Sequence, residues 1–189
     1  MNILKIYHVQ EEYIKFLRKY DDKVTIIKEH GKPRPYVGIV YEINGFKYFA
    51  PFSSPEKDDD GNLTEDYKKC FSRNSNPTYE KIEELKYGTI QINNMIPVPE
   101  TELIYFEIDN IEDKNYRTIL KDQFVYCDNN KERILNKANK LYKMVTVFKQ
   151  PHFVGLSCRF KLLEQKCKEY EYAKRIEKQA LEEALATKE

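Results

Sequence analysis

The chain has 189 residues, of which 33% are charged, 41% hydrophobic and 13% aromatic, and its formal net charge is +1. The many aromatic residues exclude a disordered chain, and the few glycines and prolines exclude a collagen-like or low-complexity architecture. No apolar run is long enough to cross a bilayer, and the N-terminus lacks the features of a secretory signal. We therefore expect a cytoplasmic protein that does not bind membranes.

Charge is distributed unevenly along the chain. Residues 1–57 carry a net charge of +3, residues 58–113 carry −9 and residues 114–175 carry +9. A basic block on helical sequence can form a positive face that attracts the phosphates of RNA or DNA, although a solvated helix surface is the plainer interpretation. The cysteines are too scattered for a zinc site, and we expect reduced thiols, no metal and no cofactor. They are Cys70, Cys127, Cys158 and Cys167.

The first 110 residues have the alternating pattern of strands, and the remainder has the spacing of helices. The predicted elements of the first half are a strand over 1–7, an amphipathic helix over 10–20, strands over 36–41 and 46–52, a polar connection over 53–77, a short helix over 79–87, and strands over 89–92 and 103–108. The predicted helices of the second half cover 116–126, 131–148 and 157–186.

Two expectations concern domain organisation and loops. Residues 1–170 are predicted to form a single domain, and residues 171–189 either a protruding helix or a frayed tail, because their apolar stripe is thin. The acidic run over 58–60 is expected to be an exposed loop, since consecutive carboxylates without a spacing pattern rarely converge on one ion.

The most informative local feature is the hairpin around Asn44 and Gly45, a pair typical of a tight turn. Antiparallel pairing across this turn is predicted to place Tyr36 near Ser53. Two residues further from the turn, it places Arg34 near Pro55. The two ends of the hairpin must therefore lie side by side.

These two ends carry Arg34 and His30 on one side, and Ser53, Ser54 and Lys57 on the other. Metal-free cleavage of an RNA phosphodiester needs a base, an acid and positive charge at the phosphorane. The hairpin ends offer cations, hydroxyls and a histidine, which titrates near neutrality. The plainer alternative is that Ser-Ser-Pro is only a turn and that the lysine is balanced by the aspartates that follow it.

Five blocks in the same order resemble the endoribonuclease toxins of type III toxin-antitoxin systems, the ToxN/AbiQ family. The blocks are residues 32–40, 48–55, 93–98, 116–123 and 160–164. The resemblance implies an α+β fold in which a compact, strongly curved antiparallel sheet, a Kid/MazF-like barrel, is flanked by helices, with a long C-terminal helix.

The family resemblance also implies an activity and a partner. It implies a metal-independent endoribonuclease that cuts cellular or phage RNA at A-rich sites and leaves a 2′,3′-cyclic phosphate. The expected inhibitor is a small repetitive antitoxin RNA that folds into pseudoknots, which the toxin also processes. A closed toxin-RNA assembly and a role in abortive phage infection belong to the same picture.

Position by position, the family's hydroxyl pair matches Ser53 and Ser54, and its basic residue before the first strand matches Arg34. His30 takes the place of a family aromatic residue and is a candidate proton shuttle. Glu56 stands where the family has a lysine, and we expect Lys57 to serve instead. The residues expected to guide RNA are Lys32, Tyr36, Lys47, Tyr116, Gln123 and Arg159.

Two other functions remain compatible with the sequence. Glu56 in place of the family lysine could leave a non-catalytic RNA-binding module that keeps the same hairpin. The long C-terminal helix could instead belong to a protein-interaction scaffold, which would bind a partner or itself and have no affinity for RNA.

Overall fold

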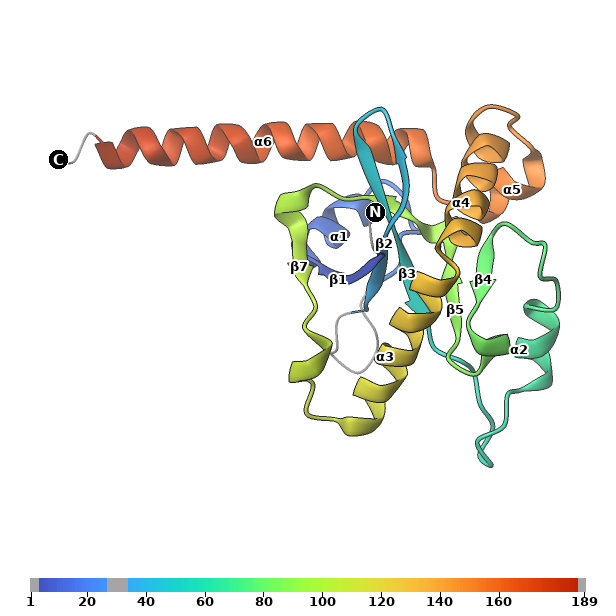
Figure 1. The fold of residues 1–189 in the computed structure, drawn as a ribbon. Coiled ribbons are helices and arrows are strands. Elements are labelled where there is room, and N and C mark those ends of the chain that lie inside the picture. The colour runs from blue at the N-terminus through green and yellow to red at the C-terminus, as the bar shows by residue number, and fades with distance from the viewer. Residues whose placement is uncertain (1–3, 27–33, 187–189) are drawn as a thin grey trace.

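The computed structural model describes residues 4–26 and 34–186, in which an antiparallel sheet is packed against helices (Figure 1). The strands follow the order β4-β5-β3-β2-β1-β7, and β6 pairs with β3. The α+β class predicted from the sequence is confirmed. The strands are β1 (Lys5–Val9), β2 (Tyr36–Ile43), β3 (Phe46–Ser53), β4 (Tyr79–Lys81), β5 (Thr89–Gln91), β6 (Ile96–Pro97) and β7 (Leu103–Tyr105).

The predicted Kid/MazF-like barrel and its strong curvature are not confirmed, because the sheet is open. Its outermost strands, β4 and β7, are three residues long and do not pair with one another. Closure of a barrel requires every strand to be hydrogen-bonded on both edges. In the chain, 3-10 turns follow both of the outermost strands. These turns are η1 (Glu83–Leu85) and η4 (Ile108–Asn110), and the others are η2 (Ile92–Asn94) and η3 (Glu100–Glu102).

The helices predicted over 116–126, 131–148 and 157–186 are confirmed, whereas the structure differs from the prediction in three places. A short helix over Pro151–Leu156 was not predicted. The helix predicted over 79–87 is wrong, since this segment forms β4 and η1. Helix α2 lies inside the polar connection, where the side chain of Thr64 accepts a hydrogen bond from the backbone N–H of Tyr67 and caps the helix. The helices are α1 (Glu11–Arg18), α2 (Glu65–Cys70), α3 (Lys114–Asn129), α4 (Lys131–Thr146), α5 (Pro151–Leu156) and α6 (Phe160–Ala186).

A buried carboxylate helps to join the helices to the sheet. Glu164 of α6 accepts hydrogen bonds from the hydroxyls of Tyr48 on β3, at 3.0 Å, and Tyr142 on α4. Lys161 balances its charge at 2.9 Å. A buried carboxylate is tolerated when it is hydrogen-bonded and paired, so this group fixes α4 and α6 against one strand.

Helix α6 leaves the domain after Tyr170, whose ring packs on Tyr13 with the centroids 4.9 Å apart. Every residue over 171–186 is exposed and helical. Figure 1 shows this segment projecting into solvent. Among residues 4–26 and 34–186, no helix is long and apolar enough to cross a membrane.

Candidate active site

The register of the β2–β3 hairpin differs from the prediction because the hairpin contains a bulge. Pairing begins as expected, with Tyr41 opposite Tyr48, but it shifts between Gly38 and Tyr41, so that Tyr36 lies opposite Pro51. Gly38 is required there, since a Cβ would meet the ring of Phe49 at 2.0 Å. The bulge shifts the pairing of the first part of β2 by two residues. Arg34 therefore lies beside the end of β3 and not beside the loop that follows it.

Arg34 is a half-buried cation at this end of the hairpin. Its Nη1 donates a hydrogen bond to the carbonyl oxygen of Phe52 at 2.8 Å. Its Nε is buried and has no hydrogen-bond partner among the described residues, and none of their carboxylates pairs with the guanidinium. Burial lowers the pKa of Arg34 below its usual value. Such a charge is costly unless an anion comes to it.

Ser53 is held in place from its other side by the turn before β5. It pairs with Thr89, and Gly88 approaches so closely that a Cβ there would lie 1.9 Å from the carbonyl oxygen of Ser53. Gly88 also has φ +88°, which favours glycine. The side-chain amide of Gln123 on α3 donates to the carbonyl oxygen of Tyr87 at 2.8 Å. Helix α3 therefore fixes the turn that supports Ser53.

The residues after Ser53 form an ordered loop with exposed side chains. Ser54, Glu56 and Lys57 are all exposed. Lys57 forms an isolated β-bridge with Leu63, and the carboxylate of Asp58 accepts hydrogen bonds from backbone N–H groups of its own loop. The ion pairs within the described chain do not include Lys57.

Helix α2 adds Tyr67, which sequence reasoning did not single out. Tyr67 is 6% exposed, and its hydroxyl has no hydrogen-bond partner in the described part of the chain. Burial raises the pKa of Tyr67, the carboxylate of Glu56 raises it further, and the nearby Thr89 hydroxyl opposes them. The phenol therefore remains a proton donor beside the loop. No local sequence signal identifies it, because its placement depends on the packing of α2.

Two of the predicted RNA contacts have structural roles here. Tyr36 is 3% exposed, and its ring lies in the core, where it cannot stack on a base in this conformation. Gln123 is buried, and its amide is engaged with the Tyr87 carbonyl. Tyr116 is half-buried in the first turn of α3, and burial raises its pKa.

The other predicted contacts pair with other parts of the chain or lie outside the described residues. Lys47 is six residues away on β3, about 20 Å at the rise of a strand, and it pairs with Glu100. The backbone N–H of Arg159 donates to the buried carboxylate of Asp21 at 2.6 Å. His30 and Lys32 belong to residues 27–33, which lie outside the described chain.

Part of the basic block over 114–175 is neutralised internally. Glu80 of β4 is buried and pairs with Arg133 and Lys137 of α4, in the second case at 2.7 Å. The hydroxyl of Tyr126 donates to the same carboxylate at 2.8 Å. These bases hold β4 on the helices and are not free to bind phosphate.

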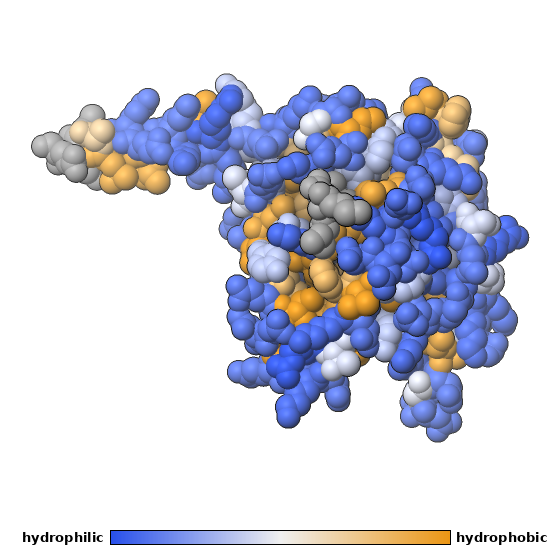
Figure 2. Space-filling view, in the orientation of Figure 1, coloured by the Kyte–Doolittle hydropathy of each residue, from blue (hydrophilic) through white to orange (hydrophobic). Residues whose placement is uncertain are grey.

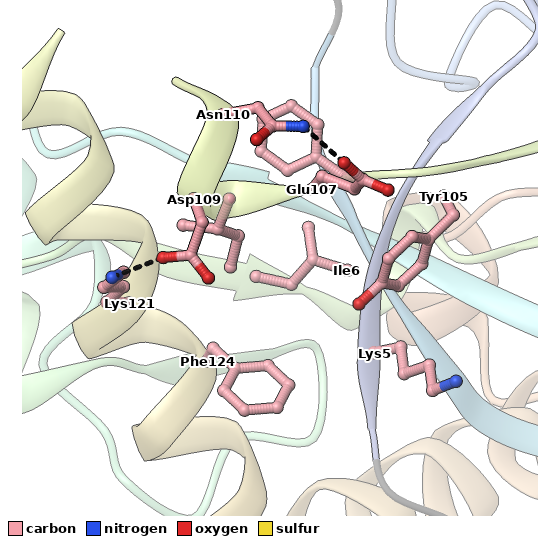
Figure 3. Close-up of a pocket in the computed structure, with 10 residues that line it drawn as sticks. Lys5, Ile6, Tyr105, Glu107, Asp109, Asn110, Lys121 and Phe124 are labelled. Carbon is pink, nitrogen blue, oxygen red and sulfur yellow. Dashed lines mark hydrogen bonds and ion pairs between the residues drawn. The ribbon is translucent and has the colours of Figure 1, made fainter. Parts of the chain in front are cut away.

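A cavity of about 560 Å³ lies on the other side of α3, between this helix and the β1–β7 edge (Figure 3). Figure 3 shows Ile6 and Phe124 between Tyr105 and the ion pair of Lys121 with Asp109, which measures 2.6 Å. The acids and bases of its lining balance one another, so a phosphate has less reason to bind here than beside Arg34.

Comparisons with known proteins identify similar sequences over most of the chain. The model of the family described as "Toxin ToxN, type III toxin-antitoxin system" matches residues 5–168. The chain is 37% identical to the endoribonuclease ToxN of Bacillus thuringiensis subsp. kurstaki, over 88% of this chain and 84% of that protein. It is 34% identical to the endoribonuclease AbiQ of Lactococcus lactis subsp. lactis, over 88% and 89%.

Solved structures extend the similarity to the fold. The structure of AbiQ, a lactococcal anti-phage endoribonuclease of a type III system, superposes with a TM-score of 0.77 and 30% identity, covering 90% of this chain and 99% of that one. A chain from work on selective toxin inhibition by a non-coding RNA pseudoknot gives a TM-score of 0.73 and 34% identity, with coverages of 90% and 99%.

Proposed function

This chain belongs to the ToxN family of type III toxin-antitoxin endoribonucleases, and from that premise we propose that it cleaves RNA at the end of strand β3 without a metal. Ser53, Ser54 and Arg34 bind the scissile phosphate, and Lys57 supplies a second positive charge. His30 is proposed as a proton shuttle. The products are a 2′,3′-cyclic phosphate and a 5′-hydroxyl, and the proposed sites of cleavage are A-rich.

One observation carries this proposal. Arg34 is a half-buried guanidinium with an unpaired buried Nε and no carboxylate partner among the described residues, and it lies against the carbonyl of Phe52 next to the two serines. A planar guanidinium is well suited to a phosphate oxygen. A bound phosphodiester would give this charge the partner it lacks, which favours a phosphate ligand over a neutral one.

The proposed reaction is an internal transesterification. The 2′-oxygen attacks phosphorus and forms the new O–P bond, while the bond from phosphorus to the 5′-oxygen breaks. The 2′-hydroxyl proton passes to a base, and an acid protonates the departing 5′-oxygen. Arg34 and Lys57 offset the charge that develops on the phosphorane oxygens, where fixed cations have their largest effect.

The proposed inhibitor is a small repetitive RNA that folds into a pseudoknot. A structural relative is reported with selective inhibition by such an RNA, and the exposed Ser54–Lys57 loop leaves this edge of the sheet accessible. An RNA that covers the loop would compete with substrate. A closed toxin-RNA assembly is part of the same proposal, with phage RNA and cellular RNA as substrates.

The test is to incubate purified protein with A-rich RNA in EDTA and to analyse the ends of the products. We expect discrete cuts with cyclic phosphate ends, and their loss in Lys57→Ala and Ser54→Ala. Lys69→Ala is the matched control, since Lys69 is an exposed lysine on the neighbouring helix α2. Cleavage that persists in both site variants would contradict the assignment of these residues.

The main alternative is a non-catalytic RNA-binding module. It predicts RNA that shifts on a native gel with strong salt dependence and stays intact. That result would contradict the nuclease proposal and make Glu56 the first residue to change, because a carboxylate beside a phosphate repels it.

A further inference from the structure

The distal part of α6 is a helix that projects from the domain (Figure 1). Residues 171–186 are all exposed. Isolated helices of this length are marginal in water, and the ion pairs within this segment, Lys174–Glu177 and Lys178–Glu182, are long at 3.8 Å each and weak. The segment therefore gains the most from packing against another surface. The family match ends at residue 168, before this segment begins.

Apolar side chains form two adjacent ridges on this helix. The first ridge contains Ile176, Ala180 and Ala184, which recur every four residues. The second ridge contains Leu181 and Leu185, each one position after an alanine of the first. Ile176 is 45% exposed, Leu181 62% and Leu185 58%. Figure 2 shows apolar colouring gathered toward the free end of α6. Ridges with a spacing of four residues are those that pack helices against each other.

The charges beside these ridges complement one another along the helix. Residues 174–178 carry a net charge of +2, and residues 179–186 carry −2, from Glu182 and Glu183. The whole stretch is therefore neutral, which disfavours RNA, and its acidic end disfavours an anionic membrane. A second copy in the opposite direction would bring each basic half across from an acidic half, whereas a parallel copy would oppose like charges.

We propose that residues 170–186 of α6 form an antiparallel helix pair with the same segment of a second copy of this chain. The two-fold axis lies beside Ala180 and Leu181, so the interface is self-complementary. Lys178 then faces Glu182 or Glu183 of the other copy, and Ile176 packs near Leu185. At 1.5 Å per residue the paired segment is about 25 Å long, which holds two domains at opposite ends.

Sedimentation velocity of the full chain, freed of nucleic acid, tests this proposal. We expect twice the mass of one chain at tens of micromolar, and the mass of one chain for Leu181→Asp/Leu185→Asp. A single-chain mass for the unaltered protein at about 100 µM would overturn the proposal. Variants in this segment should leave RNA cleavage unchanged, so the result does not depend on the proposed nuclease function.

Charge reversal tests whether the pairing depends on complementary charges. The set Lys174→Glu/Arg175→Glu/Lys178→Glu and the set Glu182→Lys/Glu183→Lys should each be monomeric, and an equimolar mixture of the two should form a one-to-one dimer. Lys140→Glu/Lys143→Glu on α4 is the control and should remain dimeric. A mixture that stays monomeric would overturn the charge pairing. RNA affinity that falls in the distal variants would identify RNA as the occupant instead.

Discussion

The guanidinium of Arg34 donates to the carbonyl oxygen of Phe52 across the open end of the hairpin, at 2.8 Å. This contact exists because the bulge between Gly38 and Tyr41 shifts the register of β2. Without the shift, the arginine would lie beside the loop after Ser53. A cation without a carboxylate partner among the described residues is thereby placed next to two serines.

Replacement of this cation by an apolar side chain should separate stability from activity. For Arg34→Met we expect RNA cleavage to fall by about 100- to 1,000-fold, since a cation at developing charge contributes on that scale. The free energy of unfolding should be unchanged or higher, because an unpaired half-buried charge is removed. Cleavage rates and urea unfolding measure the two effects. A marked loss of stability with an equal loss of activity would contradict the role in phosphate binding.

The close approach of Gly88 to Ser53 predicts a large effect of one methyl group. Gly88→Ala introduces a Cβ 1.9 Å from the Ser53 carbonyl oxygen at a positive φ, whereas Gly61→Ala has a similar φ and open space around it. Both variants pay about 1 kcal/mol for the left-handed backbone, and only Gly88→Ala must also move Ser53. Urea unfolding should show a loss at least about 2 kcal/mol greater for Gly88→Ala. Equal losses would mean that the turn relaxes freely.

The acidic residue in the loop predicts a gain of function. Glu56→Lys replaces a repulsive carboxylate beside the proposed phosphate site by a cation. RNA binding should tighten, and the slope of log affinity against log salt should steepen by about 0.7, the value for one added contact to single-stranded RNA. Glu132→Lys, an exposed residue of α4, is the control and should leave the slope unchanged. A Glu56→Lys variant with unaltered binding would place the RNA elsewhere.

The buried carboxylate of Glu164 predicts how stability depends on alkaline pH. Burial and the hydrogen bond to Glu164 raise the pKa of Tyr142 to about 12, from the usual 10. The folded chain therefore retains a proton that the unfolded chain has lost, so stability falls as the pH rises from about 10 to 12. Tyr142→Phe should reduce this decline by at most about 1.4 kcal/mol per pH unit. Denaturant midpoints at each pH measure it, and identical slopes would contradict the coupling.

The parts of the fold that depend on neighbouring residues were predictable from the sequence. Asn44 and Gly45 adopt the positive φ angles of a tight turn, and the hairpin is where it was expected. The bulge was not, and at its edge the ring of Phe49 lies over Gly38, a contact that the pattern of the sequence does not show. Residues 79–87 have helical spacing, yet Glu80 pairs with bases on α4 and the segment forms the short strand β4 and the 3-10 turn η1.

The candidate site likewise contains residues that the sequence predicts and residues that it does not. Ser53 and its neighbours follow from a local motif at the end of a predicted strand. Gly88 and Gln123 support that motif, and Tyr67 lies near Glu56, from segments 14 to 70 residues away from Ser53 in the sequence. Their contacts depend on how α2 and α3 pack, which no spacing in the sequence records.

Ser53 lies at the seam where the β4–β5 hairpin joins the rest of the sheet. On one side, β3 belongs to the sheet with β1 and β2. On the other, the β4–β5 hairpin meets β3 at only two residue pairs and is fastened to the helices through Glu80 and Gln123. A ligand that binds both β3 and the β4–β5 hairpin would connect them, so its binding energy would raise the melting temperature of the whole chain.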